Sequence, residues 1–119
     1  MQKKNINSEM RCRLRLPLKE RTFDPTFSAC FFRICQEALT NILKHSEATE
    51  VSVSVNDENS TLLLLISDNG KGMEKLELEN SVSMGLLGMR ERAKIMGAEL
   101  KIASKKNEGT TITLISSIN

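Results

Sequence analysis

One stretch decides the fold of this chain: Phe32-Arg33-Ile34-Cys35-Gln36-Glu37-Ala38-Leu39-Thr40-Asn41-Ile42-Leu43-Lys44-His45. Read as a helix at about 100° per residue, it gathers four polar side chains within roughly a 100° arc: Glu37, Asn41, Lys44 and His45. An apolar stripe begins at the edge of that arc and consists of Phe27, Phe31, Ile34, Ala38, Leu39 and Ile42. This polar border predicts either side chains that reach past the core to water or a binding site at the core's margin.

The composition is typical of a globular domain and disfavours nucleic acid as a partner. The chain has 119 residues, of which 39% are hydrophobic and 27% charged. Its net charge is only +2, because 15 acidic residues are interspersed with the 17 basic ones, so no broad basic surface is expected. Four Phe without Trp or Tyr provide few stacking platforms for bases.

The cysteines and the apolar segments favour a cytoplasmic location. Cys12, Cys30 and Cys35 are odd in number and lack the Cys-x-x-Cys spacing, which indicates neither a disulfide scaffold nor a zinc site. No stretch approaches about 18 uninterrupted apolar residues, and the N-terminus lacks the apolar core of a signal peptide. We therefore expect no membrane contact by this segment, although a longer parent protein could be anchored elsewhere.

The first half of the chain is predicted to form a strand, a helix and a hairpin. Residues 11–18 alternate basic and apolar side chains, and Pro17 near the end of this strand favours an edge position. Asp24-Pro25 is typical of a helix start, and the helix is expected to run to about His45. The alternating valines of 51–55 and the apolar run of 62–66, separated by turn residues 56–60, predict a hairpin whose second strand is central and covered.

The second half is predicted to form a helix and a hairpin after a polar segment, 73–84, that we interpret as a mobile loop. A helical stripe of Leu86, Met89, Ala93 and Met96 precedes a stop at Gly97. Residues 98–104 and 110–116 then form the last hairpin. The whole predicts an α+β two-layer sandwich, a mixed sheet with helices packed on one face. We expect residues 1–10 to be a flexible segment and residues 11–119 to form a single domain.

Two glycine-containing stretches carry candidate binding chemistry. Asp68-Asn69-Gly70-Lys71-Gly72 follows the buried strand, where a carboxylate could accept a hydrogen bond from the exocyclic amine of adenine; the alternative is a simple Asx turn. Gly85-Leu86-Leu87-Gly88-Met89 opens the second helix, whose free N–H groups favour a phosphate; the alternative is a flexible loop with a glycine cap. The Walker-type and dinucleotide-binding glycine motifs are absent.

The order and spacing of these stretches resemble the ATP-binding catalytic domain of sensor histidine kinases, whose Bergerat-type fold is shared with gyrase, Hsp90-type chaperones and MutL. Residues 37–45 resemble the N motif of that family, residues 68–72 its first glycine motif, residues 85–92 its second, and Glu108-Gly109-Thr110-Thr111 its closing strand. The sequences of residues 36–41 and of Gly88-Met89-Arg90-Glu91-Arg92 are similar to the corresponding sequences of the kinases that pair with NarL-type response regulators.

The resemblance implies a role for each matching residue. Asn41 would bind Mg²⁺, Lys44 would neutralise phosphate charge, His45 would lie near the phosphate or ribose, and Glu37 would orient or deprotonate the attacking group. Asp68 would bind the adenine amine, with Gly70 and Gly72 giving room for the ring. The phosphates would be covered by Gly85, Leu86, Gly88 and Met89, with 73–84 as the lid. Thr110 or Thr111 would contribute to the floor beneath the adenine.

The resemblance also implies partners, and two alternatives remain. The family's phosphate-accepting His lies on an upstream dimerisation helix that this sequence lacks, so the acceptor would be a His on a separate domain, and a NarL-type regulator would follow. The first alternative is a protein-serine kinase of the anti-sigma-factor type with the same fold. The second is a non-enzymatic basic interaction module, supported by the arginines of 11–15 and by Lys105-Lys106.

Overall fold

The computed structural model describes residues 11–15, 23–74, 78 and 85–118, the first range by its backbone alone. The elements along the chain are β1 (Arg11–Arg15), α1 (Pro25–Asn41), the π-helical turn η2 (Ile42–Ser46), β2 (Glu50–Glu58), β3 (Thr61–Asp68), α3 (Leu86–Ile95), β4 (Glu99–Lys105) and β5 (Gly109–Ser117). This order matches the predicted one. The predictions for residues 1–10, for residues 16–18 and for most of the 73–84 segment lie outside the described residues.

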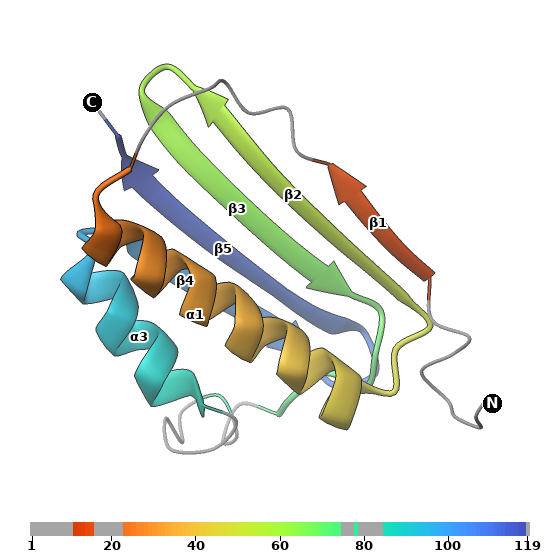
Figure 1. The fold of residues 1–119 in the computed structure, drawn as a ribbon. Helices are drawn as coiled ribbons and strands as arrows, with labels where there is room; N and C mark the ends of the chain where they lie inside the picture. Colours follow the sequence, from red (N-terminus) through yellow and green to blue (C-terminus); the bar gives the residue numbers. More distant parts are fainter. Residues whose placement is uncertain (1–10, 16–22, 75–77, 79–84, 119) are drawn as a thin grey trace, which may run out of the picture.

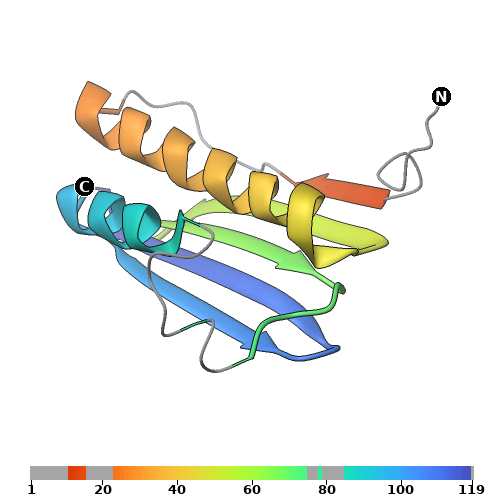
Figure 2. The same ribbon diagram turned by 90° about the horizontal axis from the view of Figure 1, so that it is seen from below.

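A five-stranded sheet with the order β1-β2-β3-β5-β4 forms one layer of the structure. β1 pairs with β2 in parallel, and the other neighbours are antiparallel. Both helices cover the same face of the sheet and lie side by side (Figure 1; Figure 2). The predicted α+β two-layer sandwich with a mixed sheet is therefore confirmed, as are the edge position of β1 and the central position of β3.

Helix α1 begins where the sequence predicts. The Asp24 carboxylate accepts hydrogen bonds from the backbone N–H groups of Thr26 at 3.0 Å and Phe27 at 3.2 Å. These bonds satisfy two of the backbone donors that lack partners in a first helical turn. Pro25 stands at the first helical position, where its missing N–H costs nothing.

The core lies between the helices and the covered face of the sheet. Ile34 and Ala38 of α1 and Met89 of α3 are fully buried against Leu64 of β3. Along β3, buried and half-buried residues alternate, because successive side chains of a strand point to opposite faces. The prediction that 62–66 is covered therefore holds completely for one face of the strand, while Leu63 and Leu65 on the other face are only half-buried.

The last turn of the first helix differs from the prediction. The α-helix ends at Asn41, and residues Ile42–Ser46 form a π turn, so the expected single α-helix to His45 is wrong at its end. Ser46 closes this turn by donating its hydroxyl to the Ile42 carbonyl at 2.8 Å and accepting the Ala48 N–H at 3.1 Å. Single π turns are rare and occur frequently at functional sites.

The first hairpin has a shorter turn than predicted. Asn56, Asp57 and Glu58 continue β2, and the connection consists of Asn59 and Ser60 alone. Both have positive φ, 53° and 59°, as a type I′ turn requires for two-residue hairpins. The turn chemistry of residues 56–58 is overridden by their pairing with β3, since strand formation depends more on cross-strand packing than on local preference.

The cap of α1 leads to a stability prediction. Asp24→Ala should lower the free energy of unfolding by about 1 kcal/mol, because two N–H groups lose their acceptor. Thr26→Ala is the matched control: it shortens a side chain in the same turn but keeps the amide, and should change the stability by less than about 0.5 kcal/mol. Urea denaturation measures both values, and equal midpoints for the two variants would contradict the role of the cap.

Candidate functional site

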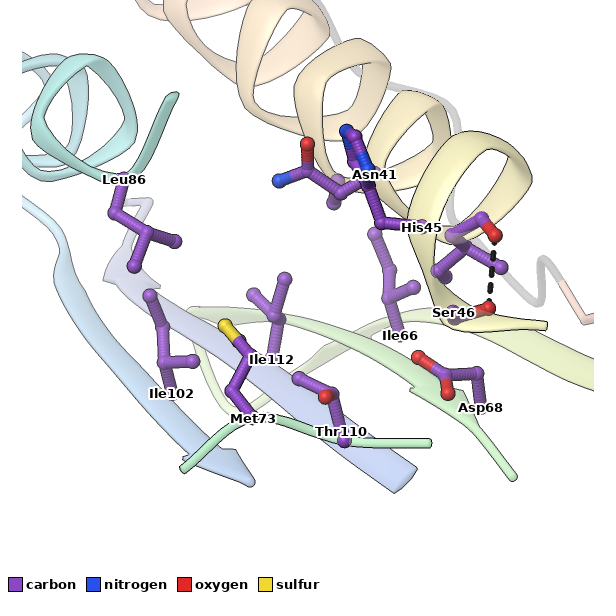
Figure 3. A pocket seen from close by; sticks show the side chains of 13 residues that line it. Asn41, His45, Ser46, Ile66, Asp68, Met73, Leu86, Ile102, Thr110 and Ile112 are labelled. Atoms are coloured by element: carbon purple, nitrogen blue, oxygen red, sulfur yellow. Dashed lines mark hydrogen bonds between the residues drawn. The ribbon is translucent and has the colours of Figure 1, made fainter. Parts of the chain in front are cut away.

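A pocket lies between the C-terminal end of the first helix and the end of the sheet where β3 meets β5 (Figure 3). Its empty space, including the open mouth and the solvent in it, is about 480 Å³. It is lined by Ala38, Asn41, Ile42, His45, Ser46, Ile66, Asp68, Gly72, Met73, Leu86, Ile102, Thr110 and Ile112. Asn41 and Asp68, which the sequence placed in two separate motifs, thus face one pocket.

The lining combines an apolar wall with polar groups at one end. Ile66 and Ile112 from the sheet and Leu86 from the start of α3 form much of the wall, while Asp68 and Thr110 stand at the end of the sheet (Figure 3). Aliphatic walls with a few fixed polar groups are typical of sites that bind an aromatic ring and read its edge.

Asp68 is the buried carboxyl group of this pocket, with 8% of its surface exposed. Its Oδ1 accepts the Gly70 N–H at 2.7 Å, and the Thr110 N–H is a second backbone donor to the carboxyl group. Desolvation raises the pKa of Asp68 above its usual value, and the two backbone N–H donors oppose that rise. The Asx turn is therefore present, and the same carboxyl also lines the pocket, so the two interpretations of this residue are compatible.

The loop after β3 is attached on one side to the corner between η2 and β2. Asn69 Oδ1 accepts the backbone N–H groups of Thr49 and Glu50, each at 2.9 Å, and its Nδ2 donates to Thr49 Oγ1 at 2.9 Å. The Lys71 N–H donates to the Ser46 carbonyl at 2.7 Å. The loop therefore continues the pairing of the sheet with side-chain bonds.

On its other side the same loop is attached to the end of the β4–β5 hairpin. The Asn107 N–H donates to the Lys71 carbonyl at 2.6 Å, and the Met73 N–H donates to Ser104 Oγ at 2.8 Å. Lys106 Nζ donates to Glu74 Oε1 at 2.8 Å and lowers the pKa of that exposed carboxyl. The loop that carries Asp68 is thus held from both sides.

The glycines of this loop make room for protein backbone. A methyl group at Gly70 would collide with the Ser46 carbonyl oxygen, and one at Gly72, where φ is +66°, would collide with the Lys105 carbonyl oxygen. Gly72 lines the pocket and Gly70 does not. In the structure the missing side chains of Gly70 and Gly72 give space to the two neighbouring segments; their role in giving room for the ring stays a prediction.

The predicted residues of the N motif are divided between the pocket and its surroundings. Asn41 and His45 line the pocket, whereas Lys44 is exposed and is not part of the lining. Glu37 lies against Gly85, where an added Cβ would be 2.7 Å from its Oε2. Its carboxylate therefore lies at the N-terminal end of α3, where the helix favours negative charge.

The second glycine motif contributes one side chain to the pocket. Leu86 is part of the lining, while Gly85 and Gly88 are not. The side chain of Met89 is fully buried in the core, so the predicted contact of this residue with a phosphate could involve only its backbone amide. At Gly88 the guanidinium of Arg92 lies over the helix, 2.7 Å from the position that a Cβ would occupy.

Of the two candidate threonines, Thr110 lines the pocket. Thr111 points to the opposite face of the sheet, where its hydroxyl lies 3.2 Å from Ser67 Oγ. The alternation of β5 could have decided between them, because Ile112 and Leu114 are buried beneath the helices and Thr110 shares their face. The same alternation could have added Ile66 and Ile112 to the site. No pattern in the sequence indicated that Ser46, Met73 and Ile102 would line the pocket.

Asn41 fits the role of a single protein ligand to a magnesium ion whose other ligands are phosphate and water oxygens. Mg²⁺ prefers oxygen donors and takes one or two from protein, with the rest from phosphates and water. Asn41 lines the pocket, and its side chain contains an amide oxygen. Within the described ranges, no group of three or more His, Cys, Asp or Glu side chains could hold a metal.

Known proteins are similar to this chain over most of its length. The family model described as "Histidine kinase-, DNA gyrase B-, and HSP90-like ATPase" matches residues 28–117. The signal transduction histidine-protein kinase/phosphatase DegS of Bacillus subtilis is 41% identical over 92 residues, 76% of this chain and 24% of that protein. The sensor protein VraS of Staphylococcus aureus is 46% identical over 91 residues, 74% of this chain and 25% of that protein. The chain thus spans about a quarter of the length of these relatives.

Solved structures share the fold. The histidine kinase domain of the blue-light-activated kinase EL346 of Erythrobacter litoralis has a TM-score of 0.81 at 18% identity, covering 95% of this chain and 56% of that one. The histidine kinase AdeS of Acinetobacter baumannii has a TM-score of 0.76 at 15% identity, over 95% and 56% of the two chains.

In the part of the chain that the structure describes, no helix is long and apolar enough to cross a membrane.

The glycine contacts lead to a second prediction. Gly72→Ala should destabilise the protein by about 2–5 kcal/mol, because it combines a positive φ with a collision at the Lys105 carbonyl. Gly97→Ala is the matched control, since Gly97 has φ +74° but open space around it, and should cost only about 1–2 kcal/mol. Urea denaturation compares the two, and equal losses would show that the close approach at Gly72 is unimportant.

Proposed function

This chain belongs to the histidine kinase-, DNA gyrase B- and HSP90-like ATPase family, and from that premise we propose that it is the ATP-binding catalytic domain of a two-component sensor histidine kinase. The observation that carries the proposal is the shared pocket of Asp68 and Asn41. In a Mg-ATP site, the Asp68 carboxyl would bind the base at one end and the Asn41 amide would bind the metal at the other. The named relatives, a histidine-protein kinase and a sensor protein, support the histidine type over the serine kinase alternative.

Adenine would occupy the apolar part of the pocket. The Asp68 carboxyl, held by two backbone N–H donors, would accept a hydrogen of the exocyclic amine. Ile66 and Ile112 would cover the ring on the sheet side, and Thr110 rather than Thr111 would contribute the hydroxyl of the floor.

The triphosphate would extend from the pocket toward the N-terminal end of α3. There the first backbone N–H groups of the helix, at Gly85, Leu86 and Gly88, favour an anion. His45 would lie near the ribose or the phosphates, and the exposed Lys44 would reach them from the π turn. Asn41 would supply the protein oxygen to Mg²⁺, whose chemistry is to bridge and neutralise the phosphates.

Glu37 would act on the nucleophile. In the transfer step a nitrogen of an acceptor His attacks the γ-phosphorus, the new N–P bond forms as the bond to the bridging oxygen breaks, and ADP leaves. The Glu37 carboxylate, one turn before Asn41, would orient the imidazole and take its proton. Its location beside Gly85 supports a role at the phosphate end of the site.

The partners follow from the same proposal. The acceptor His would lie on a dimerisation domain of the parent kinase, and a NarL-type response regulator would receive the phosphoryl group from it. The Gly88-Met89-Arg90-Glu91-Arg92 wording supports that subclass. Because ATP is available in the cytoplasm, an ATP-binding role places this domain there.

A titration tests the binding proposal. Isothermal calorimetry with a non-hydrolysable ATP analogue should give saturable binding that is stronger with Mg²⁺ than without it. Asp68→Asn should weaken binding roughly tenfold or more with or without the metal, because an amide NH₂ replaces an acceptor. Asn41→Ala should reduce chiefly the gain that Mg²⁺ brings. Absence of binding by the unaltered protein would refute the proposal.

A transfer assay tests the catalytic role. Glu37→Gln should keep binding of the ATP analogue within about threefold and lower phosphoryl transfer to an added acceptor domain by roughly 10²-fold or more, since the amide cannot take a proton. Transfer is measured as acid-labile phosphate on the acceptor. Glu91→Gln, on the exposed side of α3, is the charge-matched control, and equal transfer by the two variants would exclude Glu37 as the base.

A further inference from the structure

Ser104 forms a hydrogen-bonded hub directly behind the pocket. It lies in β4, is half-buried and is not among the lining residues. Its hydroxyl oxygen accepts the Met73 N–H at 2.8 Å, lies 3.1 Å from the Gly109 carbonyl, and lies 2.6 Å from the Thr110 hydroxyl. One side chain thus connects the loop after Asp68 with the first residues of β5.

The number of protons in this hub fixes the direction of its bonds. A backbone N–H can only donate, so Ser104 accepts from Met73; a carbonyl can only accept, so Ser104 gives its single hydroxyl proton to Gly109. Either hydroxyl could donate in the remaining bond, between Ser104 and Thr110; with the Ser104 proton on Gly109, the donor is Thr110. The 2.6 Å separation fits an O–H···O bond. The Thr110 hydroxyl then has only its lone pairs left for a ligand of the pocket that this residue lines.

Two acceptors consequently meet at the polar end of the pocket. The register pairs Asp68 with Thr110 on adjacent strands, and both line the pocket. We propose that Ser104 is a positioning residue that sets the base specificity of the site, holding Thr110 as an acceptor so that Asp68 and Thr110 together select a purine with an amino group at position 6. This inference rests on the proposed ATP site and deepens it.

The chemistry of position 6 explains the selection. An exocyclic amine carries two N–H hydrogens, one for Asp68 and one for Thr110, directly or through a water. A 6-oxo purine presents an acceptor at the same place, so neither protein acceptor is satisfied, and a buried polar group without its partner is costly. Without Ser104 the Thr110 hydroxyl would be free to rotate and donate to the oxo group.

The test compares ATP with inosine triphosphate, which carries an oxo group at position 6. The unaltered protein should prefer ATP, and Ser104→Ala should reduce the ATP-to-ITP ratio of affinities by roughly three- to tenfold, mainly by improving ITP binding. Ser104→Thr keeps the hydroxyl and should retain the original ratio. A purely structural role would weaken both nucleotides in parallel and leave the ratio unchanged.

Two further variants sharpen the result. Ser67→Ala removes the hydroxyl of the corresponding Ser–Thr pair on the opposite face of the sheet and should alter neither the affinity for ATP nor the ratio. Thr110→Val removes the selecting hydroxyl itself and should lower the ratio as much as Ser104→Ala, with no further loss in the double variant. It also provides the test if Ser104→Ala fails to fold.

The outcomes separate the two proposals. An unchanged ratio in Ser104→Ala or in Thr110→Val would overturn the role of Ser104 while leaving ATP binding intact, and so would an unaltered protein that binds ATP and ITP equally. If the unaltered protein bound neither nucleotide, the proposed function would fail and this inference with it.

Discussion

The structure depends on the close contact of three backbone segments at one end of the sheet. The loop that leaves β3 lies between the corner at Ser46 and the end of the β4–β5 hairpin, bound by the Lys71 N–H on one side and the Lys71 carbonyl on the other. Only hydrogen atoms at Gly70 and Gly72 permit this spacing. Because the loop is fixed from both sides, Asp68 has a defined direction, and a buried carboxyl needs such order to be useful in recognition.

The helices complete the site from above that end of the sheet. The core that attaches α1 to the sheet, with Ile34 and Ala38 fully buried, also determines where Asn41 and His45 lie. The π turn then carries the chain over the pocket before Ser46 closes it. Core packing and the proposed metal and base contacts are therefore parts of one arrangement, in which the pocket separates the polar border of the helix from the end of β3.

Local patterns were sufficient for the order of the elements and for the Asp24 cap, because periodicity and caps depend on neighbouring residues. The meeting of Asn41 with Asp68 followed only from the resemblance to the kinase family, since these residues are far apart in the sequence. Local patterns were insufficient for the π turn, since Ile42–Ser46 has ordinary helical composition. They also missed Ser46 and Ser104, whose bonds join residues far apart in sequence. The alternation of β5 could have separated Thr110 from Thr111. The contacts of Gly70 and Gly72 join segments that no single motif contains.

The two-residue turn at Asn59 and Ser60 lies at the other end of the β2–β3 hairpin from Asp68. Chain length at the Asp68 end is constrained by the contacts among three segments, whereas the hairpin tip borders no pocket residue. Evolutionary or engineered insertions should consequently accumulate at that tip, which makes it the natural place to attach a fluorophore or a reporter domain without disturbing ligand recognition.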